Sequence, residues 1–310
     1  MPSRRRLLQA ASAATTVALA GCANSLSNQS TERTYTLSIQ RIDQSPVEHA
    51  LYEPDESALF GDPERAALAD ILPDGRHTTY GYRPLPEDAY VERDGAYYQT
   101  KYVVTGRKQM DRPLVRAASI PKEDVPDDAV VVDALERPSA RVVKILHTHT
   151  HGSSASAPLR DGAYVLRRPA ELESRLVDGD LDGRVVTMTP DGTWAYRLDV
   201  TRERIAETAY TALAVEVADS HESFRNVVFG SRIDADLSPT DLSSDVRQLL
   251  EQTIATKTHD ESEPLPSAFT ALLTALGLER ESENGRLLWY DRQLYRYGLY
   301  VNPTNEQRRR

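Results

Sequence analysis

The sequence contains a single cysteine and only four phenylalanines in its 310 residues. One cysteine excludes an intramolecular disulfide framework and any metal site that needs several thiolates. The chain also lacks a phosphate-binding glycine-rich loop, a dinucleotide fingerprint and a Gly-x-Ser-x-Gly nucleophile motif, so no common catalytic constellation is present. Its net charge of -10 argues against a general nucleic-acid binder, which needs a basic face to displace counterions.

Lysine is scarce as well: the chain has five lysines against 32 arginines, and its 47 acids divide into 25 aspartates and 22 glutamates. This balance resembles the composition of proteins from extreme halophiles. At molar salt the Debye length is about 3 Å, so the acidic side chains of such a surface barely repel each other. We therefore expect the protein to lose structure when salt falls to about 0.1 M. The alternative is an ordinary acidic protein from a GC-rich genome, which also favours arginine over lysine.

The N-terminus has the order of a secretory signal. A basic segment with three arginines is followed by an apolar run of small residues from Leu7 to Ala20. As a helix, this run is about 21 Å long, which is too short to span a hydrocarbon core of about 30 Å. The order of charged, apolar and small residues predicts a signal peptide over residues 1–21.

The signal ends on a short motif that includes the only cysteine. Leu19, Ala20, Gly21 and Cys22 resemble the lipobox of bacterial-type lipoproteins. The resemblance implies cleavage between Gly21 and Cys22 and a lipid on Cys22, which would be the membrane anchor. The alternative is a chance cysteine near the end of an ordinary signal.

The export route is indicated by the arginines at the start. Arg4 and Arg5 lie in Ser-Arg-Arg-Arg-Leu-Leu, which resembles a twin-arginine motif that routes folded cargo. The alternative is a merely basic signal of the general secretory route. Residues 22–34 are small and polar, and we expect a flexible tether there. For residues 304–310, which end in three arginines, we expect a disordered tail.

The body of the chain predicts an α+β fold with antiparallel sheets. Runs with period-2 alternation alternate with helical patterns, among them those of residues 242–254 and 269–276. Turn signals such as Asp94-Gly95 and Asp291-Arg292 lie between the strands. The same order of strand, helix and tyrosine-rich hairpin recurs, which predicts three modules over residues 35–135, 136–207 and 208–303. The alternative to a true repeat is chance, because many α+β chains show this order.

The signal, the composition and the recurring hairpins together resemble lipid-anchored haloarchaeal surface proteins of unknown function. The resemblance implies a location on the extracellular face of the cell membrane and brings no biochemical activity with it. We therefore expect a non-catalytic binding or structural role, with the membrane as partner through Cys22 and with no nucleic-acid partner. An accessory subunit of a membrane complex is a further alternative, which a large apolar surface patch would indicate.

A histidine-rich segment carries the main alternative function. The run from Val142 to Leu146 predicts a strand, and its continuation would place His147, His149 and His151 on one face, about 6.5 to 7 Å apart per step. Neutral imidazole suits zinc and copper, so these residues indicate a metal-binding protein or a metal-dependent hydrolase. The simpler interpretation is an exposed strand end that runs into a serine-rich loop.

An acidic run offers a weaker metal site. Asp178, Asp180 and Asp182 alternate with glycine and leucine and resemble part of a calcium loop. The bidentate glutamate that such a loop needs at its twelfth position is missing. The run is equally well explained as a turn between a helix and a strand.

Overall fold

The computed structural model describes residues 33–151 and 159–303. The predicted signal peptide, with Arg4, Arg5, Leu19, Ala20, Gly21 and Cys22, lies outside the described residues, as do nearly all of the predicted tether and the predicted tail. Among the described residues, no helix is both long and apolar enough to cross a membrane. The described residues contain helices and mainly antiparallel sheets, which confirms the predicted α+β class.

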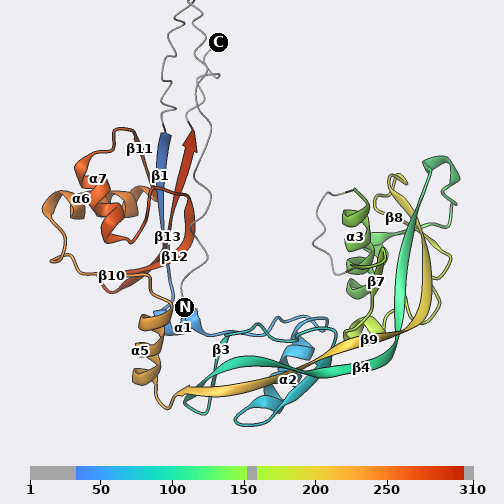
Figure 1. Ribbon diagram of the computed structural model, residues 1–310. Helices are drawn as coiled ribbons and strands as arrows, with labels where there is room; N and C mark the ends of the chain where they lie inside the picture. Colours follow the sequence, from blue (N-terminus) through green and yellow to red (C-terminus); the bar gives the residue numbers. More distant parts are fainter. Residues whose placement is uncertain (1–32, 152–158, 304–310) are drawn as a thin grey trace, which may run out of the picture.

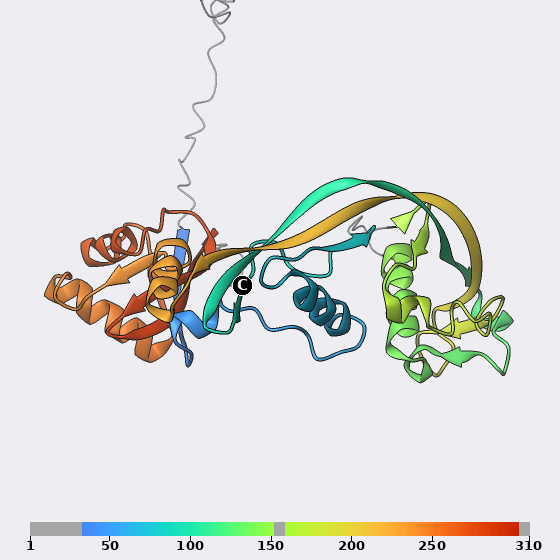
Figure 2. The same ribbon diagram turned by 90° about the horizontal axis from the view of Figure 1, so that it is seen from below.

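Two long paired strands connect the two ends of the molecule (Figure 1). Strand β4 (Ala96–Ile120) has 25 residues and strand β9 (Ala195–Ala218) has 24, and they pair antiparallel along almost their whole length. At about 3.4 Å per residue, this two-stranded ribbon follows a path of roughly 80 Å. The ribbon arches from one lobe of the molecule to the other (Figure 2).

The terminal lobe, named for the two ends of the described chain, holds a five-stranded sheet and two helices. Its first strand, β1 (Arg33–Ile42), pairs with its last strand, β13 (Gln293–Pro303), so that Arg33 lies opposite Pro303. The alternating residues Tyr35, Leu37 and Ile39 are fully or almost fully buried and form one core with the helices. In sheet order, the elements are β10 (Ala235–Leu237), β12 (Glu283–Tyr290), β13 (Gln293–Pro303), β1 (Arg33–Ile42) and β11 (Thr258–Ser262), with α6 (Ser244–Thr256) and α7 (Ser267–Ala275).

The distal lobe, residues 111–207 apart from 152–158, lies at the other end of the ribbon (Figure 1). In its core, the buried face of helix α3 (Arg137–His151) packs against the ends of the ribbon through residues such as Val143, Leu146 and Tyr196. Its strands are short, so most of its sheet is the ribbon itself. Besides the ribbon ends, the elements are β5 (Val130–Val131), α3 (Arg137–His151), β6 (Leu159–Arg160), β7 (Ala163–Val165), α4 (Pro169–Leu172) and β8 (Val185–Thr187), with single 3-10 turns at Lys122–Asp124 and Val132–Ala134.

Smaller elements cover the half of the ribbon that is near the terminal lobe. Phe224 stacks on Tyr97 of the ribbon, with ring centroids 4.2 Å apart, and Ala67 and Ile71 pack against Ala212. These contacts pack apolar side chains against this half of the two-stranded ribbon and stabilise it. The elements are α1 (Pro46–Ala50), α2 (Gly61–Ile71), β2 (His77–Tyr80), β3 (Tyr90–Arg93) and α5 (His221–Ser231).

Several local predictions are confirmed. The hairpin at Asp94-Gly95 is present, with φ of 55° and 82° at the two turn residues. The helices expected near 242–254 and 269–276 correspond to α6 and α7, and the hairpin around Asp291 joins β12 to β13. Each of these elements depends on residues close together in sequence.

The strands pair across the boundaries that the sequence suggested between modules. Strand β1 from 35–135 pairs with β13 and β11 from 208–303, and β4 pairs with β9, which runs from 136–207 into 208–303. The sheets therefore do not follow the three expected modules. A period-2 pattern identifies a strand but carries no information about its partner.

The histidine segment is a helix, so the predicted strand from Val142 through His151 is wrong. Helix α3 covers Arg137–His151. Its buried residues include Ser139, Val142, Val143 and Leu146, which follow the spacing of a helix that buries one face. The β-branched residues suggested a strand, but burial of this face against the ribbon outweighs their weak local preference.

Candidate functional site

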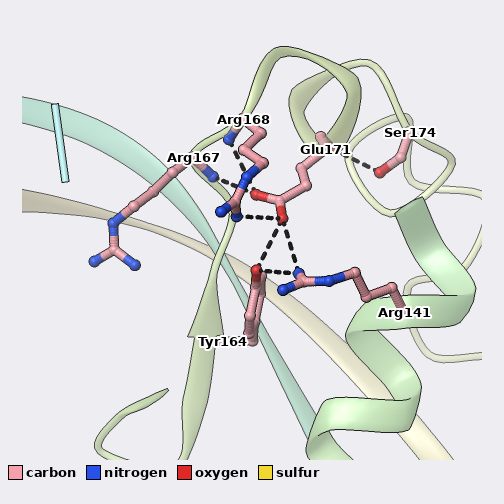
Figure 3. Close-up of polar contacts among 6 residues, drawn as sticks. All are labelled: Arg141, Tyr164, Arg167, Arg168, Glu171 and Ser174. Carbon is pink, nitrogen blue, oxygen red and sulfur yellow. Dashed lines mark hydrogen bonds and ion pairs between the residues drawn. The ribbon is translucent and has the colours of Figure 1, made fainter. Parts of the chain in front are cut away.

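A buried carboxylate, Glu171, is the centre of a polar cluster in the distal lobe (Figure 3). Glu171 is 1% exposed and lies at the third position of α4. Its Oε2 accepts hydrogen bonds from the backbone N–H groups of Arg167 and Arg168, at 2.9 and 3.0 Å. The Tyr164 hydroxyl donates to its Oε1 at 2.8 Å. The start of α4 thus holds this carboxylate in one position.

Two guanidinium groups compensate the charge of Glu171. Arg141 of α3 and Arg168 lie 3.4 and 3.5 Å from Oε1. Arg141 also donates to the Tyr164 hydroxyl at 2.8 Å. Burial raises the pKa of Tyr164, and the negative charge of Glu171 raises it further, so the phenol stays neutral and remains a donor.

A second buried carboxylate, Glu207 of β9, lies where the ribbon enters the distal lobe. Arg167 donates to it from Nε at 2.8 Å, and Nε of the buried Arg112 lies 3.6 Å away. Burial lowers the pKa of Arg112, and the charge of Glu207 acts in the opposite direction. Gly81 packs so closely that a Cβ there would lie 2.3 Å from a Glu207 oxygen. The Arg167–Glu207 ion pair therefore joins the ribbon to the segment between β7 and α4, and Gly81 in the loop after β2 packs against it.

An aromatic ring connects the Glu171 cluster to the segment before α2. The guanidinium groups of Arg141 and Arg168 each lie 5.1 Å from the centre of the Phe60 ring, and Arg168 also lies 5.4 Å from the Tyr82 ring. Such cation–π contacts strengthen when they are shielded from water.

Taken together, four arginines face two buried carboxylates, which leaves two positive charges uncompensated within the cluster. The side chains of Arg141 and Arg168 keep 31% and 21% of their surface exposed. The cluster thus presents a positive side to solvent, and chemically it can hold an anionic group by charge-assisted hydrogen bonds.

The structure brings together two of the three predicted histidines. His147 Nδ1 lies 2.6 Å and His151 Nε2 lies 2.7 Å from the same atom, the hydroxyl oxygen of Tyr196. The Trp194 ring lies beside both imidazoles, with centroid distances of 5.4 and 6.1 Å. His149 is exposed and takes no part in these contacts. A helix separates positions two residues apart, so a set of all three histidines on one face is not formed.

Burial favours the neutral forms of His147 and Tyr196. It lowers the pKa of His147, as does the neighbouring His151, and it raises the pKa of the Tyr196 phenol. Within residues 33–151 and 159–303, no three histidine, cysteine or acidic side chains converge on a position for a metal ion. The two imidazoles therefore face a neutral phenol, that of Tyr196.

Two of the three carboxylates in the acidic run at 178–183 have partners within the protein. Asp182 accepts a hydrogen bond from the backbone of Val200 at 2.9 Å, and Asp180 pairs with Arg175 at 3.6 Å. These contacts match the turn interpretation of the run.

Sequence reasoning did not find the Glu171 cluster or the partners of the histidines. One local signal was available for Glu171: a proline at the first helical position with glutamate two residues later marks a helix start. Tyr196 is 45 residues or more from the histidines that contact it, and no local pattern indicates that contact.

Comparison of the chain with protein-family models, with curated proteins and with solved structures finds no match. Function is therefore inferred from the residues and geometry of the chain itself.

Proposed function

We propose that the protein is a lipid-anchored, non-catalytic binding protein on the outer face of a haloarchaeal cell membrane, with the distal lobe as its binding end. One observation supports this most. Strands β1 and β13 pair with Arg33 opposite Pro303, so the described chain begins and ends at the same edge of the terminal lobe. A lipid near the N-terminus would therefore hold the terminal lobe, and the ribbon would carry the distal lobe away from it (Figure 1).

The lengths fit this arrangement. Cys22 precedes Arg33 by eleven residues, which reach at most about 40 Å when extended. The part of the ribbon outside the distal lobe, residues 96–110 of β4, adds a path of roughly 50 Å between the lobes. The terminal lobe would thus stay within a short distance of the membrane, while the distal lobe would be displaced sideways from it along the ribbon, where it could meet a ligand or partner (Figure 1).

The distal lobe also carries the surface features that favour a binding role. It presents the positive side formed by Arg141 and Arg168, and Trp194 is 52% exposed although it is a large aromatic residue. Exposed arginine and tryptophan side chains are common at binding surfaces. The sequence offers no catalytic constellation to compete with this role.

The test is the location of Cys22→Ser in a haloarchaeal host. The parent should fractionate with membranes and be cut by protease added to intact cells, and Cys22→Ser should appear in the medium. Ser25→Ala, a neighbouring polar change, is the control and should stay membrane-bound. Retention of Cys22→Ser on membranes would contradict the lipid anchor.

The export route has its own test. Replacing Arg4 and Arg5 together by lysine should leave the full-length chain inside the cell, because the twin-arginine route reads the arginine pair. Normal export of this double variant would assign the protein to the general secretory route.

A further inference from the structure

We propose that His147, His151 and Tyr196 form a copper(II) site on the distal lobe, with Nδ1 of His147, Nε2 of His151 and the hydroxyl oxygen of Tyr196 as its three protein donors. The site is independent of the lipid anchor. It differs from the three-histidine strand expected from the sequence, because the third donor is Tyr196 of β9 and not His149.

The first support is convergence of the donor atoms. Positions four residues apart lie on one face of a helix, and the two imidazole centroids are 4.8 Å apart. Both nitrogens approach one oxygen, at 2.6 and 2.7 Å. In the square-planar arrangement that copper(II) prefers, neighbouring ligand atoms with bonds of about 2.0–2.1 Å are about 2.9 Å apart, so the nitrogen–oxygen separations would lengthen by only about 0.3 Å.

The second support is preorganisation. Tyr196 is fully buried and is fixed on β9, and Leu146 and Val143 hold the inner face of α3 in the core of the distal lobe. A ligand set on a packed helix and strand needs little ordering when an ion arrives.

The third support is that an ion can reach the site from solvent and that its nitrogen and oxygen donor atoms suit copper(II). His147 is half-buried, His151 is exposed, and both rings lie at the surface beside Trp194, so an ion can enter from solvent. Mixed nitrogen and oxygen donors suit copper(II), which also binds such sites more tightly than the other divalent first-row ions. On binding, the phenol proton of Tyr196 leaves to solvent, the phenolate oxygen takes its place on the ion, and water fills the remaining positions.

The experiment uses the full chain without a histidine tag, in molar salt, with two background changes. Cys22→Ser removes the only thiol, and Trp289→Phe leaves Trp194 as the only tryptophan. Copper(II) quenches a nearby indole, so titration should quench Trp194 with one equivalent of ion. His149→Ala is the matched control on the same helix and should bind as the background protein does.

His147→Ala and His151→Ala should each weaken copper binding by at least tenfold. His151 is exposed, so its replacement leaves the core intact, and circular dichroism will verify the fold of every variant. Copper binding by His151→Ala equal to that of His149→Ala, or quenching that never saturates at micromolar copper, would overturn the site.

Tyr196→Phe tests the oxygen donor. The copper complex of the background protein should show a tyrosinate-to-copper absorption band in the visible region, and Tyr196→Phe should lose this band and bind severalfold more weakly. A complex with no such band, or with unchanged affinity in Tyr196→Phe, would overturn Tyr196 as a ligand.

Discussion

The two lobes belong to one α+β chain but are stabilised differently. In the terminal lobe, a five-stranded sheet and two helices enclose an apolar core, and none of the buried charged side chains of the described residues lies there. In the distal lobe, the strands beside the ribbon have two or three residues, and Glu171, Arg112 and Glu207 are buried.

The difference between the lobes indicates that buried ion pairs position the elements where the strands are too short to do so. Where strands are long, alternation of apolar residues specifies the sheet and its packing. Where the strands are short, the hydrogen bonds and ion pairs around Glu171 and Glu207 determine how three elements pack against the ribbon. These elements are α3, α4 and the loop that follows β2. A buried ion pair adds little net stability over apolar packing, but loss of one partner is costly.

The largest effects are expected from Glu171→Gln and from Leu272→Ala. Glu171→Gln leaves Arg141 and Arg168 without their carboxylate in a buried position, and unfolding free energy should fall by about 3 kcal/mol. Chemical denaturation in molar salt measures this. The exposed neighbour Glu173→Gln is the control and should change stability little. A loss for Glu171→Gln as small as that of the control would remove the contrast between the lobes.

Leu272→Ala tests the terminal lobe in the same way. Leu272 is fully buried between α7 and the sheet, so its truncation should cost about 3 kcal/mol. Hydrogen exchange should speed up in β1 and β13 and stay unchanged in α3, because the ribbon separates the two cores. Faster exchange in both lobes would show that they unfold as one unit. Leu249→Ala, at a partly buried position, should cost less.

Gly81→Ala tests the joint between ribbon and distal lobe. Gly81 has φ of +79°, and its new methyl group would lie 2.4 Å from Arg167 Nε as well as against Glu207. The expected loss is about 2 kcal/mol, part of it from backbone strain. Gly95→Ala shares the positive φ but meets no atom within 4 Å, so the difference between the two variants isolates the clash. Equal losses would mean that the ion pair moves aside without cost.

The smallest effect concerns pH and the histidine pair. The folded protein lowers the pKa of His147, so the unfolded chain takes up the proton first as pH falls. Neutral His147 therefore makes its full contribution to the free energy of unfolding above the unfolded-chain pKa of about 6.5. This contribution is lost as pH falls from about 6.5 to the lower pKa that His147 has in the folded protein. His147→Gln should therefore show a smaller fall in melting temperature between pH 7.5 and pH 5 than the parent. Parallel pH profiles would contradict a depressed pKa.

The sequence predicted what depends on near neighbours. The turn at Asp94-Gly95 and the helices α6 and α7 follow from local residues, and they are present as expected. What depends on distant residues was not accessible: β1 closes its sheet with a strand some 260 residues later. The burial of α3 against the ribbon was hidden for the same reason, so His147 and His151 were assigned to a strand.

The ribbon has one more consequence. Ile120 and Ala195, where β4 ends and β9 begins, lie opposite each other in the ladder, so everything between them enters and leaves through one pair of neighbouring residues. The intervening residues are in effect an insertion at the tip of a β-hairpin. A hairpin tip tolerates insertions because its two ends are already close. The lobe at this tip could thus be replaced by another during evolution, or exchanged by an engineer, while the rest of the fold keeps its strand pairing.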